Sequence, residues 1–333
     1  MDTPFVSNAP IVNAPEHKGM NQSESSDDTV QIVLSIIIPT LNDTLIREVV
    51  NQILDELSTL DKQVYASEII VVGKDDELRL ANLLPAQQPL IKFIDTRTPV
   101  GASVSRNIGI CAASGDWFIF IDSDCLVQPG WAEAMTKRLA AGENIVGGGV
   151  SFSTNSYWPL VYNLSMFHEF LASRSACEKR YLPTLNLAIK RTVIDQIGYL
   201  DETLTRGQDM DWTIRMVQGG FRLFFEPTAT ISHQPTRADW STVWRYWIKS
   251  GYYSSRNRRK YKDYYQTPKF LSYPWMMRLL SPFIALIVTT RIFLRLPKEL
   301  KFVSTIPPIY MTKIAWCLGA SSSISEEKSN SLL

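Results

Sequence analysis

Two carboxylates separated by one residue follow an apolar, aromatic segment near the middle of the chain. Residues 117–121 read Trp-Phe-Ile-Phe-Ile, and Asp122 and Asp124 come directly after them. Because no polar residue interrupts the segment, it predicts a fully buried strand. Ligands of α/β sheets bind outside the carboxyl ends of such strands, and carboxylate oxygens suit magnesium or manganese. The pattern therefore indicates a divalent-cation site, although Asp-Ser-Asp is also an ordinary turn sequence.

A second group of acidic residues opens a predicted helix over residues 209–218, which ends at a pair of glycines. Asp209 and Asp211 lie in its first turn. A carboxylate held beside a substrate hydroxyl can take the proton of that hydroxyl, so Asp209 is a candidate general base. The alternative is structural, because the helix dipole favours acidic side chains at an N-terminus.

The elements that would position these acids alternate between strands and helices. The first strands and the helices between them are predicted over residues 32–38, 44–60, 68–72, 91–94, 101–113 and 117–121. This alternation predicts βαβ units with right-handed crossovers and a mostly parallel sheet, which is an α/β fold. Further strands, over residues 185–189, 222–225 and 228–232, would complete the domain.

Four segments look like the successive motifs of the family 2 glycosyltransferases. They appear in the family's order within Val33–His233, at residues 35–42, 100–109, 121–124 and 207–212. The resemblance implies a GT-A fold, in which a Rossmann-like, mostly parallel sheet flanked by helices binds a nucleotide sugar and a second half binds the acceptor. It also implies an enzyme of hexosyltransferase type, which moves a sugar from a nucleotide diphosphate to a hydroxyl group with inversion at the anomeric carbon.

The resemblance gives the acidic residues their roles. Asp122 and Asp124 match the metal-binding DxD motif, and His233 matches a position that joins the metal in some relatives. The cation, Mg²⁺ or Mn²⁺, would neutralise the diphosphate of the donor and stabilise the charge on that leaving group. Asp209 matches the proposed catalytic base, and Asp211 would orient the site.

The same resemblance places the donor along the ends of the first strands. Arg106 would contact the diphosphate together with Asp122, since a guanidinium group suits phosphate geometry. A surface salt bridge is the alternative role for this arginine. Pro39, Thr40 and Asn42 match the loop that holds the nucleoside base.

The sequence departs from the family pattern at several positions. Relatives commonly read Asp-Asp-Gly-Ser after the second strand, whereas this chain reads Gly-Lys-Asp-Asp at 73–76, so that Asp75 would contact the base through a longer loop. Gln208 stands where the family usually has Glu, and Leu41 where many relatives have an aromatic residue. These departures keep open a catalytically inactive family member that serves as a membrane-bound scaffold. A nucleotidyltransferase is a weaker alternative, because the first strand is not followed by a Gly-rich, Lys-containing phosphate loop.

The composition describes a globular protein with an uneven distribution of charge. The 333 residues are 45% hydrophobic and 20% charged, which is enough to build a core. The formal net charge is +1, yet residues 237–301 contain fourteen Lys and Arg against three acids. This excess predicts an anionic partner for the C-terminal part. The four cysteines show no metal-ligand spacing and the N-terminus shows no signal-peptide pattern, so the cytosol is the expected compartment.

The C-terminal part interleaves aromatic and basic residues, which suits either an anionic membrane surface or a nucleic acid. Two apolar stretches, over residues 279–290 and 302–320, favour the membrane, although the first is short and the second contains Pro307, Pro308 and Lys313. A span needs about 20 apolar residues, so we expect interfacial or re-entrant helices at the cytoplasmic face rather than two spans. The expected acceptor is a lipid-linked or polysaccharide glycan, and we expect no nucleic-acid partner.

These observations divide the chain into four predicted segments. Residues 1–29 read as a disordered tail, and residues 30–235 as the GT-A domain. Residues 236–320 form the basic and apolar helical region that would associate with the membrane. Residues 321–333, which are rich in serine, are predicted to be a flexible tail.

Overall fold

The structure is a computed structural model that describes residues 31–81, 90–153, 155–237, 239–296 and 300–330. The tail predicted over residues 1–29 lies outside the described residues. The described residues from Gln31 onward belong to one compact unit.

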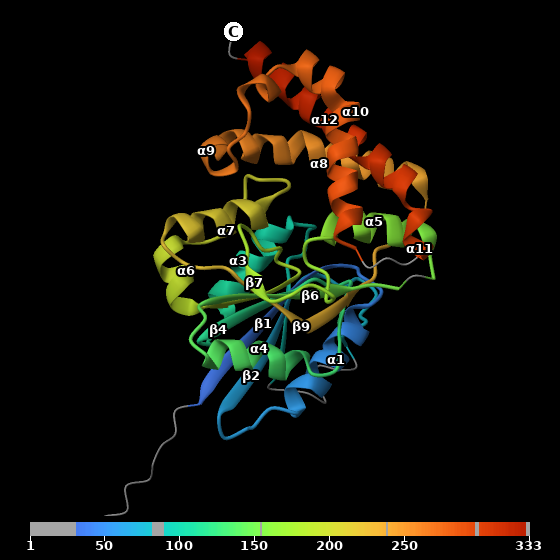
Figure 1. The fold of residues 1–333 in the computed structure, drawn as a ribbon. Coiled ribbons are helices and arrows are strands. Elements are labelled where there is room, and N and C mark those ends of the chain that lie inside the picture. Colours follow the sequence, from blue (N-terminus) through green and yellow to red (C-terminus); the bar gives the residue numbers. More distant parts are fainter. Residues whose placement is uncertain (1–30, 82–89, 154, 238, 297–299, 331–333) are drawn as a thin grey trace, which may run out of the picture. The chain divides into compact units, whose positions relative to one another are not determined.

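A nine-stranded mixed sheet forms the centre of the described chain (Figure 1). Its order is β3-β2-β1-β4-β8-β6-β9-β5, and β7 pairs with β9 beside this path. The strands are β1 (Ile32–Leu41), β2 (Tyr65–Lys74), β3 (Ile91–Asp95), β4 (Trp117–Ile121), β5 (Cys125–Val127), β6 (Ile145–Ser151), β7 (Cys177–Glu178), β8 (Asn186–Lys190) and β9 (Phe224–His233).

The first four strands are parallel, as the alternation of elements predicts. Beyond β4 the sheet becomes mixed, because β8 pairs antiparallel with both β4 and β6. The two short strands predicted over residues 222–232 are a single strand, β9, whose pairing with β6 shifts between Gly148 and Gly149. The sheet thus consists of a parallel half and a mixed half, and β4 lies where the two meet.

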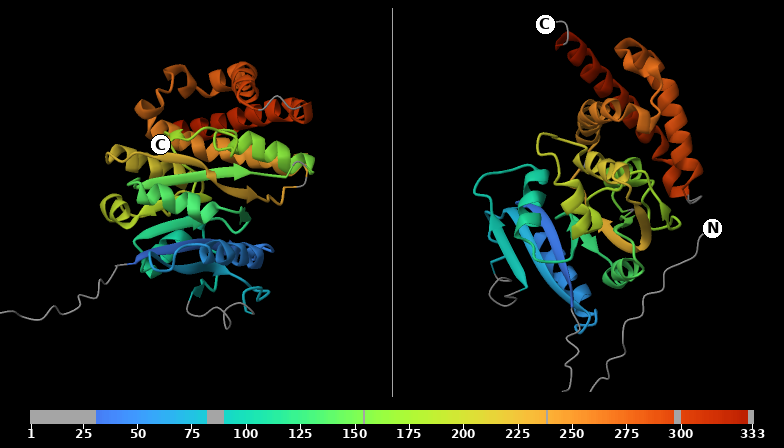
Figure 2. Two further views of the ribbon diagram at one scale, coloured as in Figure 1. Left: turned by 60° about the horizontal axis from the view of Figure 1, so that its bottom comes forward. Right: turned by 90° about the vertical axis from the view of Figure 1, so that its left-hand side faces the viewer.

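Helices flank this sheet and continue beyond it (Figures 1 and 2). Those of the first part are α1 (Ile46–Ser58), α3 (Ala102–Ala112), α4 (Trp131–Ala140), α5 (Tyr157–Phe167), α6 (Arg191–Ile197) and α7 (Gln208–Gln218). The C-terminal part contains α8 (Trp240–Lys260), α9 (Lys262–Tyr265), the 3-10 helix η1 (Lys269–Ser272), α10 (Pro274–Leu294), α11 (Leu300–Val303) and α12 (Ile306–Asn330).

The buried side chains of β4 attach α7 to the sheet. All five residues of β4 are buried, which confirms the strand predicted from their apolar character. The ring of Phe120 meets the fully buried ring of Trp212 edge to face, with centroids 5.5 Å apart. The indole Nε1 of Trp212 also donates a hydrogen bond to the carbonyl oxygen of Gly198 (2.8 Å). The first turn of α7 is therefore held close to the carboxyl end of β4.

Helices α8 and α12 pack closely because each has a glycine at the contact with the other. A Cβ atom on Gly251 would lie 2.0 Å from the carbonyl oxygen of Trp316, and one on Gly319 would lie 2.0 Å from that of Ile248. Helix α10 packs beside α12 (Figure 2). Among the described residues it is the one helix long and apolar enough to cross a membrane, and 28% of its most apolar window is buried.

The flexible tail predicted from residue 321 is wrong for residues 321–330, which continue α12. The small side chains of Ser321 and Ser323 are fully buried, and Glu327 forms a salt bridge with Arg259 of α8 (2.6 Å). The serine content of this segment predicted a flexible tail, but the small serine side chains permit close packing between helices. Pro307 and Pro308 do not break the helix, because they lie in its first turn, where a proline removes no intrahelical hydrogen bond.

Candidate active site

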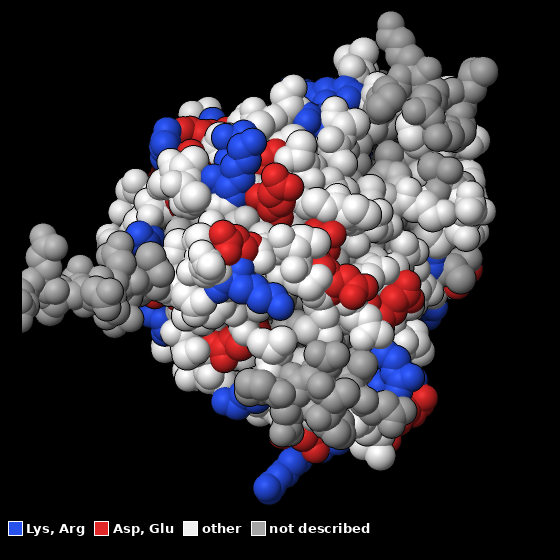
Figure 3. All heavy atoms as spheres, turned by 90° about the horizontal axis from the view of Figure 1, so that it is seen from below, with Lys and Arg blue, Asp and Glu red and all other residues white. Residues whose placement is uncertain are grey.

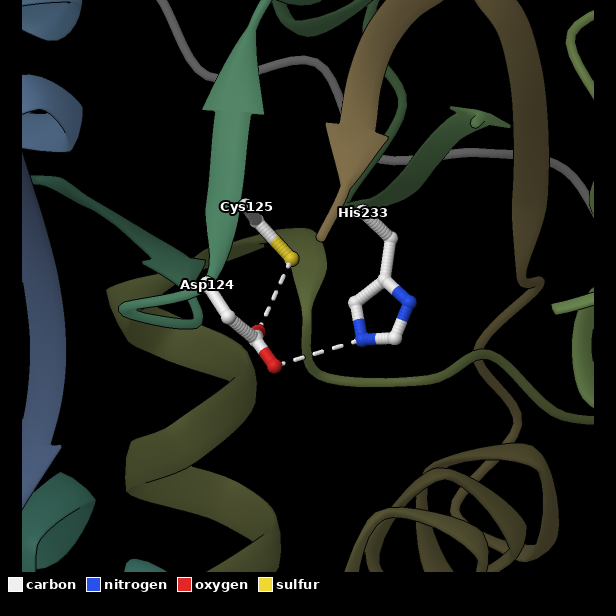
Figure 4. Close-up of side chains that lie close together, drawn as sticks. All are labelled: Asp124, Cys125 and His233. Carbon is white, nitrogen blue, oxygen red and sulfur yellow. Dashed lines mark hydrogen bonds and ion pairs between the residues drawn. The ribbon is translucent and has the colours of Figure 1, made fainter. Parts of the chain in front are cut away.

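The carboxyl end of β4 carries the two predicted metal ligands. Asp122 and Asp124 follow Ile121, and their side chains are 33% and 28% exposed. Strand β5 starts at the next residue and pairs antiparallel with β9, so that Cys125 lies opposite His233. This pairing brings the imidazole Nε2 of His233 to 3.4 Å from a carboxylate oxygen of Asp124 (Figure 4).

A helix behind the sheet fixes the imidazole of His233. Its Nδ1 is hydrogen bonded to the side-chain oxygen of Asn163 on α5, and the amide of Asn163 donates back to the His233 carbonyl oxygen (3.4 Å). The side-chain oxygen of Asn163 can only accept a hydrogen bond, so Nδ1 is the donor and Nε2 is the ring nitrogen that faces the carboxylate of Asp124. A cation between Nε2 and this carboxylate would be bound by both, and a hydrogen-bonded imidazole is a common metal ligand.

The remaining donor atoms fit a divalent cation held by oxygen and nitrogen. Asp124, Cys125 and His233 have potential ligand atoms within 4.8 Å of one another. Burial raises the pKa of the Cys125 thiol well above its ordinary value, with a further increase from the charge of Asp124. The thiol therefore stays protonated and donates toward Asp124 (3.5 Å). Asp124 and His233 thus offer an oxygen and a nitrogen, atoms that suit Mn²⁺ or Mg²⁺, whereas Asp122 is bound by Arg106 and does not belong to this close group.

Arg106 supplies the positive charge at this site. It lies on α3, is buried, and forms a salt bridge with Asp122. Its Nε is buried and has no hydrogen-bond partner among the described residues. A buried guanidinium with an unused donor is suited to bind an additional oxygen ligand such as a phosphate.

Asp209 lies at the start of α7, after Gly207, which adopts a left-handed conformation with φ of 78°. Burial raises the pKa of Asp209 above its ordinary value, and the negative charge of Asp122 raises it further. A hydrogen bond from the Met210 amide and the charge of Arg106 act in the opposite direction. The carboxylate of Asp209 therefore interacts electrostatically with Arg106 and Asp122 near the end of β4.

One cavity of about 1410 Å³ joins these groups. Five of the residues predicted to act in the site line it: Arg106, Asp122, Asp124, Asp209 and His233. Gln208 lines it as well, and the cavity extends to residues of α8, α10 and α12. The other predicted residues, Pro39, Thr40, Asn42, Asp75 and Asp211, are not among its lining.

Asp211 faces away from the cavity and connects α7 to α8. Its carboxylate is fully buried and accepts hydrogen bonds from Arg215 (3.0 Å), Lys260 (2.6 Å) and Tyr261 (2.6 Å). Although desolvation opposes ionisation, the three hydrogen bonds outweigh it and lower the pKa of Asp211. These contacts favour a structural role over the orienting role expected from the sequence.

We predict that Asp211→Ala lowers the free energy of unfolding by about 2–3 kcal/mol, because Arg215, Lys260 and Tyr261 lose a shared buried acceptor. The folded-state pKa is lowered, so this contribution is present above the ordinary value of 3.8 and is lost as the pH falls through the folded-state value. Urea unfolding of the variant at neutral and acidic pH measures both effects. The exposed Asp195→Ala on α6 is the control, and equal stability of both variants would contradict the prediction.

The residues expected to hold the nucleoside base lie at the ends of β1 and β2. Asn42 and Asp76 are joined by two hydrogen bonds of 2.8 Å, which tie the two loops together. Asp75 is buried, and one of its carboxylate oxygens has no hydrogen-bond partner among the described residues; the buried hydroxyl of Thr40 has none either. Gly73 makes this geometry possible, because a Cβ atom there would lie 1.8 Å from the Thr40 carbonyl oxygen. The Thr40 hydroxyl and this Asp75 oxygen, which lies 3.9 Å from the guanidinium of Arg79, are suited to contact a ligand.

Sequence reasoning missed three residues at the site. Asp43 accepts a hydrogen bond from Ser123 (3.2 Å), and burial followed by the charge of Asp124 raises its pKa. Asn163 holds His233, and the guanidinium of Arg237 stacks on aromatic rings beside Asp124, 4.2 Å from the Tyr162 centroid. The position of Asp43 directly after the base loop was a usable signal, whereas Asn163 lies in an aromatic segment with no motif.

Asn186 forms a polar contact inside the sheet. Its side chain is buried, accepts a hydrogen bond from the indole of Trp131 (3.0 Å) and donates to the carbonyl oxygens of Gly149 and Ala229. A Cβ atom on Gly148 would lie 2.0 Å from the Asn186 amide nitrogen. The glycines of β6 therefore make room for this polar contact inside the sheet.

Comparison with known proteins identifies the domain that contains this site. Residues 35–198 match the model of the family described as "Glycosyl transferase family 2". The chain carries a family 2 glycosyltransferase domain. The glycosyltransferase domain has the GT-A fold: a mannosyltransferase from Pyrobaculum calidifontis, solved in complex with GDP-Man and Mn²⁺, superimposes with a TM-score of 0.58. That alignment covers 91% of this chain and 89% of the other, at 16% identity.

Two curated relatives are also glycosyltransferases. Glycosyltransferase AglE of Haloferax volcanii is 25% identical over 197 residues, which cover 58% of this chain and 64% of AglE. The amylovoran biosynthesis glycosyltransferase AmsB of Erwinia amylovora is 24% identical over 225 residues, which cover 62% of this chain and 71% of AmsB. The chain thus spans somewhat less than two thirds of AglE.

Proposed function

We propose that this protein is a metal-dependent glycosyltransferase that moves a sugar from a nucleotide diphosphate to a hydroxyl acceptor. The observation that carries the proposal is the convergence of Arg106, Asp122, Asp124, Asp209 and His233 on one cavity. The Pyrobaculum calidifontis neighbour, which was solved with GDP-Man and Mn²⁺, supports a similar donor for this fold.

Asp122, Asp124 and His233 would hold the cation, which supplies positive charge to the donor diphosphate. Arg106 adds its guanidinium beside Asp122, so that the leaving group enters a site with two sources of positive charge. Thr40 and Asp75 would contact the nucleoside through the side-chain oxygens that lack a hydrogen-bond partner among the described residues. Asn42 would fix the loop after β1 through its hydrogen bond to Asp76. Pro39 would shape the same loop at the end of β1.

Asp209 would take the proton of the acceptor hydroxyl as the oxygen attacks the anomeric carbon. The raised pKa of this carboxylate makes it a stronger base than an ordinary aspartate. A single displacement from the face opposite the leaving group inverts the anomeric centre. Asp209 and Arg106 line the same cavity, which supports this arrangement.

The C-terminal helices would bind the cytoplasmic face of a membrane and present a lipid-linked or polysaccharide acceptor. Large apolar side chains of α10 are exposed, namely Trp275, Leu279, Phe283, Leu286, Ile287 and Leu294. A helix of this kind favours the boundary between headgroups and acyl chains. Seen from below, the molecule presents acidic and basic side chains mixed together on its described surface (Figure 3). The basic residues of α8 lie at the other end of the molecule (Figure 1), which supports that end as the side facing an anionic surface.

A screen of nucleotide sugars tests the proposal. Purified full-length protein should hydrolyse one donor slowly in the presence of Mn²⁺ or Mg²⁺, and EDTA should reduce the rate at least about 100-fold, because the diphosphate then loses the charge that stabilises it. Calorimetry with UDP and GDP measures binding separately. An inactive scaffold would bind neither nucleotide in a metal-dependent manner, and that result would overturn the proposal.

A further inference from the structure

The cavity that contains Asp209 ends at a buried lysine that no motif of the family explains. Lys313 lies on α12, is 8% exposed, and lines this cavity. Its ammonium group donates one hydrogen bond to the carbonyl oxygen of Ser165 (2.8 Å) and lies 4.0 Å from the ring centroid of Trp247. Among the described residues it forms no salt bridge. Burying an ammonium group without a carboxylate is costly, so an anion that entered this site would stabilise the charged form of Lys313.

The charges of this lysine and of two arginines act together on His168. Arg174 and Arg295 line the same cavity, and the charge of Arg295 acts unfavourably on Arg174. Glu169 is the carboxylate that acts on both Arg174 and Lys313, and its contact with Arg295 is long (3.9 Å). This end of the cavity therefore contains more cationic than anionic groups.

Burial lowers the pKa of two side chains at this end of the cavity, and neighbouring positive charge lowers one of them further. Burial lowers the pKa of Lys313 to about 7, with small opposing contributions from Cys317 and Glu169. Burial, followed by the charges of Lys313 and Arg174, lowers the pKa of His168 to about 3. The Nδ1 of His168 is buried and has no hydrogen-bond partner among the described residues. A bound anion would favour the charged form of Lys313 and leave this polar group close to a ligand.

The other wall of the cavity is apolar. Residues of η1, α10 and α12 supply this part of the lining, namely Leu271, Met277, Ile284, Val288 and Ile324. An inorganic anion gains nothing from such a wall, whereas an anionic group on a long hydrocarbon chain can bury that chain against it.

We propose that Lys313, Arg174 and Arg295 bind the phosphate groups of a lipid-linked acceptor, with the hydrocarbon chain along α10 and α12. The inference rests on the proposed function, because it makes the lipid phosphate part of the molecule that receives the sugar. Helix α5 connects the two sites: Asn163 holds His233, and the carbonyl oxygen of Ser165 holds Lys313. The proposed phosphate site and the His233 site thus lie two residues apart along the same helix.

Binding of farnesyl diphosphate to the full-length protein in EDTA tests the inference, since without a divalent cation the carboxylates of the donor site repel the probe. We expect Lys313→Met to weaken this binding about 10- to 100-fold, because charged hydrogen bonds to phosphate are lost. Lys137→Met removes an equal charge from an exposed position on α4 and should leave the affinity unchanged. Inorganic diphosphate should bind at least about 10-fold more weakly than farnesyl diphosphate, because it lacks the chain.

Several results would overturn the inference. Equal affinity of farnesyl diphosphate for the wild type and Lys313→Met would remove the lysine from the site. Equal affinity of inorganic and farnesyl diphosphate would assign the site to a free phosphate instead of a lipid. A lower melting temperature of Lys313→Met would indicate a structural role, since replacing an unpaired buried charge by a thioether should not destabilise the fold. Binding of UDP and GDP with Mn²⁺, measured on the same samples, reports separately on the proposed transferase function.

Discussion

Replacing both Asp122 and Asp124 by asparagine should reduce transfer at least about 1000-fold. In the proposed mechanism the cation would stabilise the charge on the leaving diphosphate by several kcal/mol, and each 1.4 kcal/mol corresponds to a factor of ten in rate. Asparagine is preferable to alanine because its oxygen still accepts the hydrogen bond of Arg106, which would otherwise be buried beside an empty position. The measurement is the initial rate of sugar transfer at saturating Mn²⁺.

The loss should appear in donor binding as well as in turnover. Mn²⁺-dependent binding of the nucleotide should disappear in the double variant, whereas its thermal unfolding should resemble that of the wild type. Asp55→Asn, at an exposed position of α1, changes the charge without touching the site and serves as the control. A double variant that retains metal-dependent nucleotide binding would show that the end of β4 does not hold the cation.

Asp209→Asn should lower kcat about 10²- to 10⁴-fold and leave donor binding nearly unchanged. Asparagine keeps the shape of the side chain but cannot accept the proton of the acceptor hydroxyl, and general base catalysis contributes about this factor. Asp195→Asn on α6 is the matched control. If Asp209→Asn lost nucleotide affinity and activity in equal measure, the residue would belong to the donor site instead.

The pH dependence provides a second test of the same residue. A base acts in its deprotonated form, so activity should fall as the pH decreases through the pKa of Asp209. Because burial raises that pKa, the acidic limb of the kcat/KM profile should lie above the ordinary aspartate value of 3.8. In Asp209→Asn this limb should be absent from the residual activity.

The sequence was sufficient to predict the parallel half of the sheet because its strands are continuous apolar segments. Residues 117–121 and 32–38 contain almost no polar side chains, and such segments form buried parallel strands. The mixed half was harder, since β5 has three residues and β7 two, too few for a period to show. The register shift between β6 and β9 depends on how the two strands pair, and pairing cannot be read from one sequence.

The candidate site divides in a similar way. Asp122 and Asp209 could be found because they occur in motifs with a fixed order along the chain. Asp211 stands in the same motif, yet its carboxylate is taken by Lys260 and Tyr261, about fifty positions away. Lys313 was visible as an interruption of an apolar stretch, but its meaning depends on the wall that α5 forms opposite it.

Helix α8 is hydrogen bonded to the first turn of α7, which carries the proposed base Asp209. The side-chain amide of Asn257 donates a hydrogen bond to the carbonyl oxygen of Gly207 (2.7 Å), the residue before α7. One turn further along α7, the carboxylate of Asp211 accepts a hydrogen bond from Lys260. The catalytic domain and the C-terminal helices are thus not interchangeable modules. In a chimera of residues 30–235 with the C-terminal helices of a relative, the proposed metal ligands would all be present. Asp209 would keep its position only if the new helix had an amide side chain in place of Asn257 and a cation in place of Lys260.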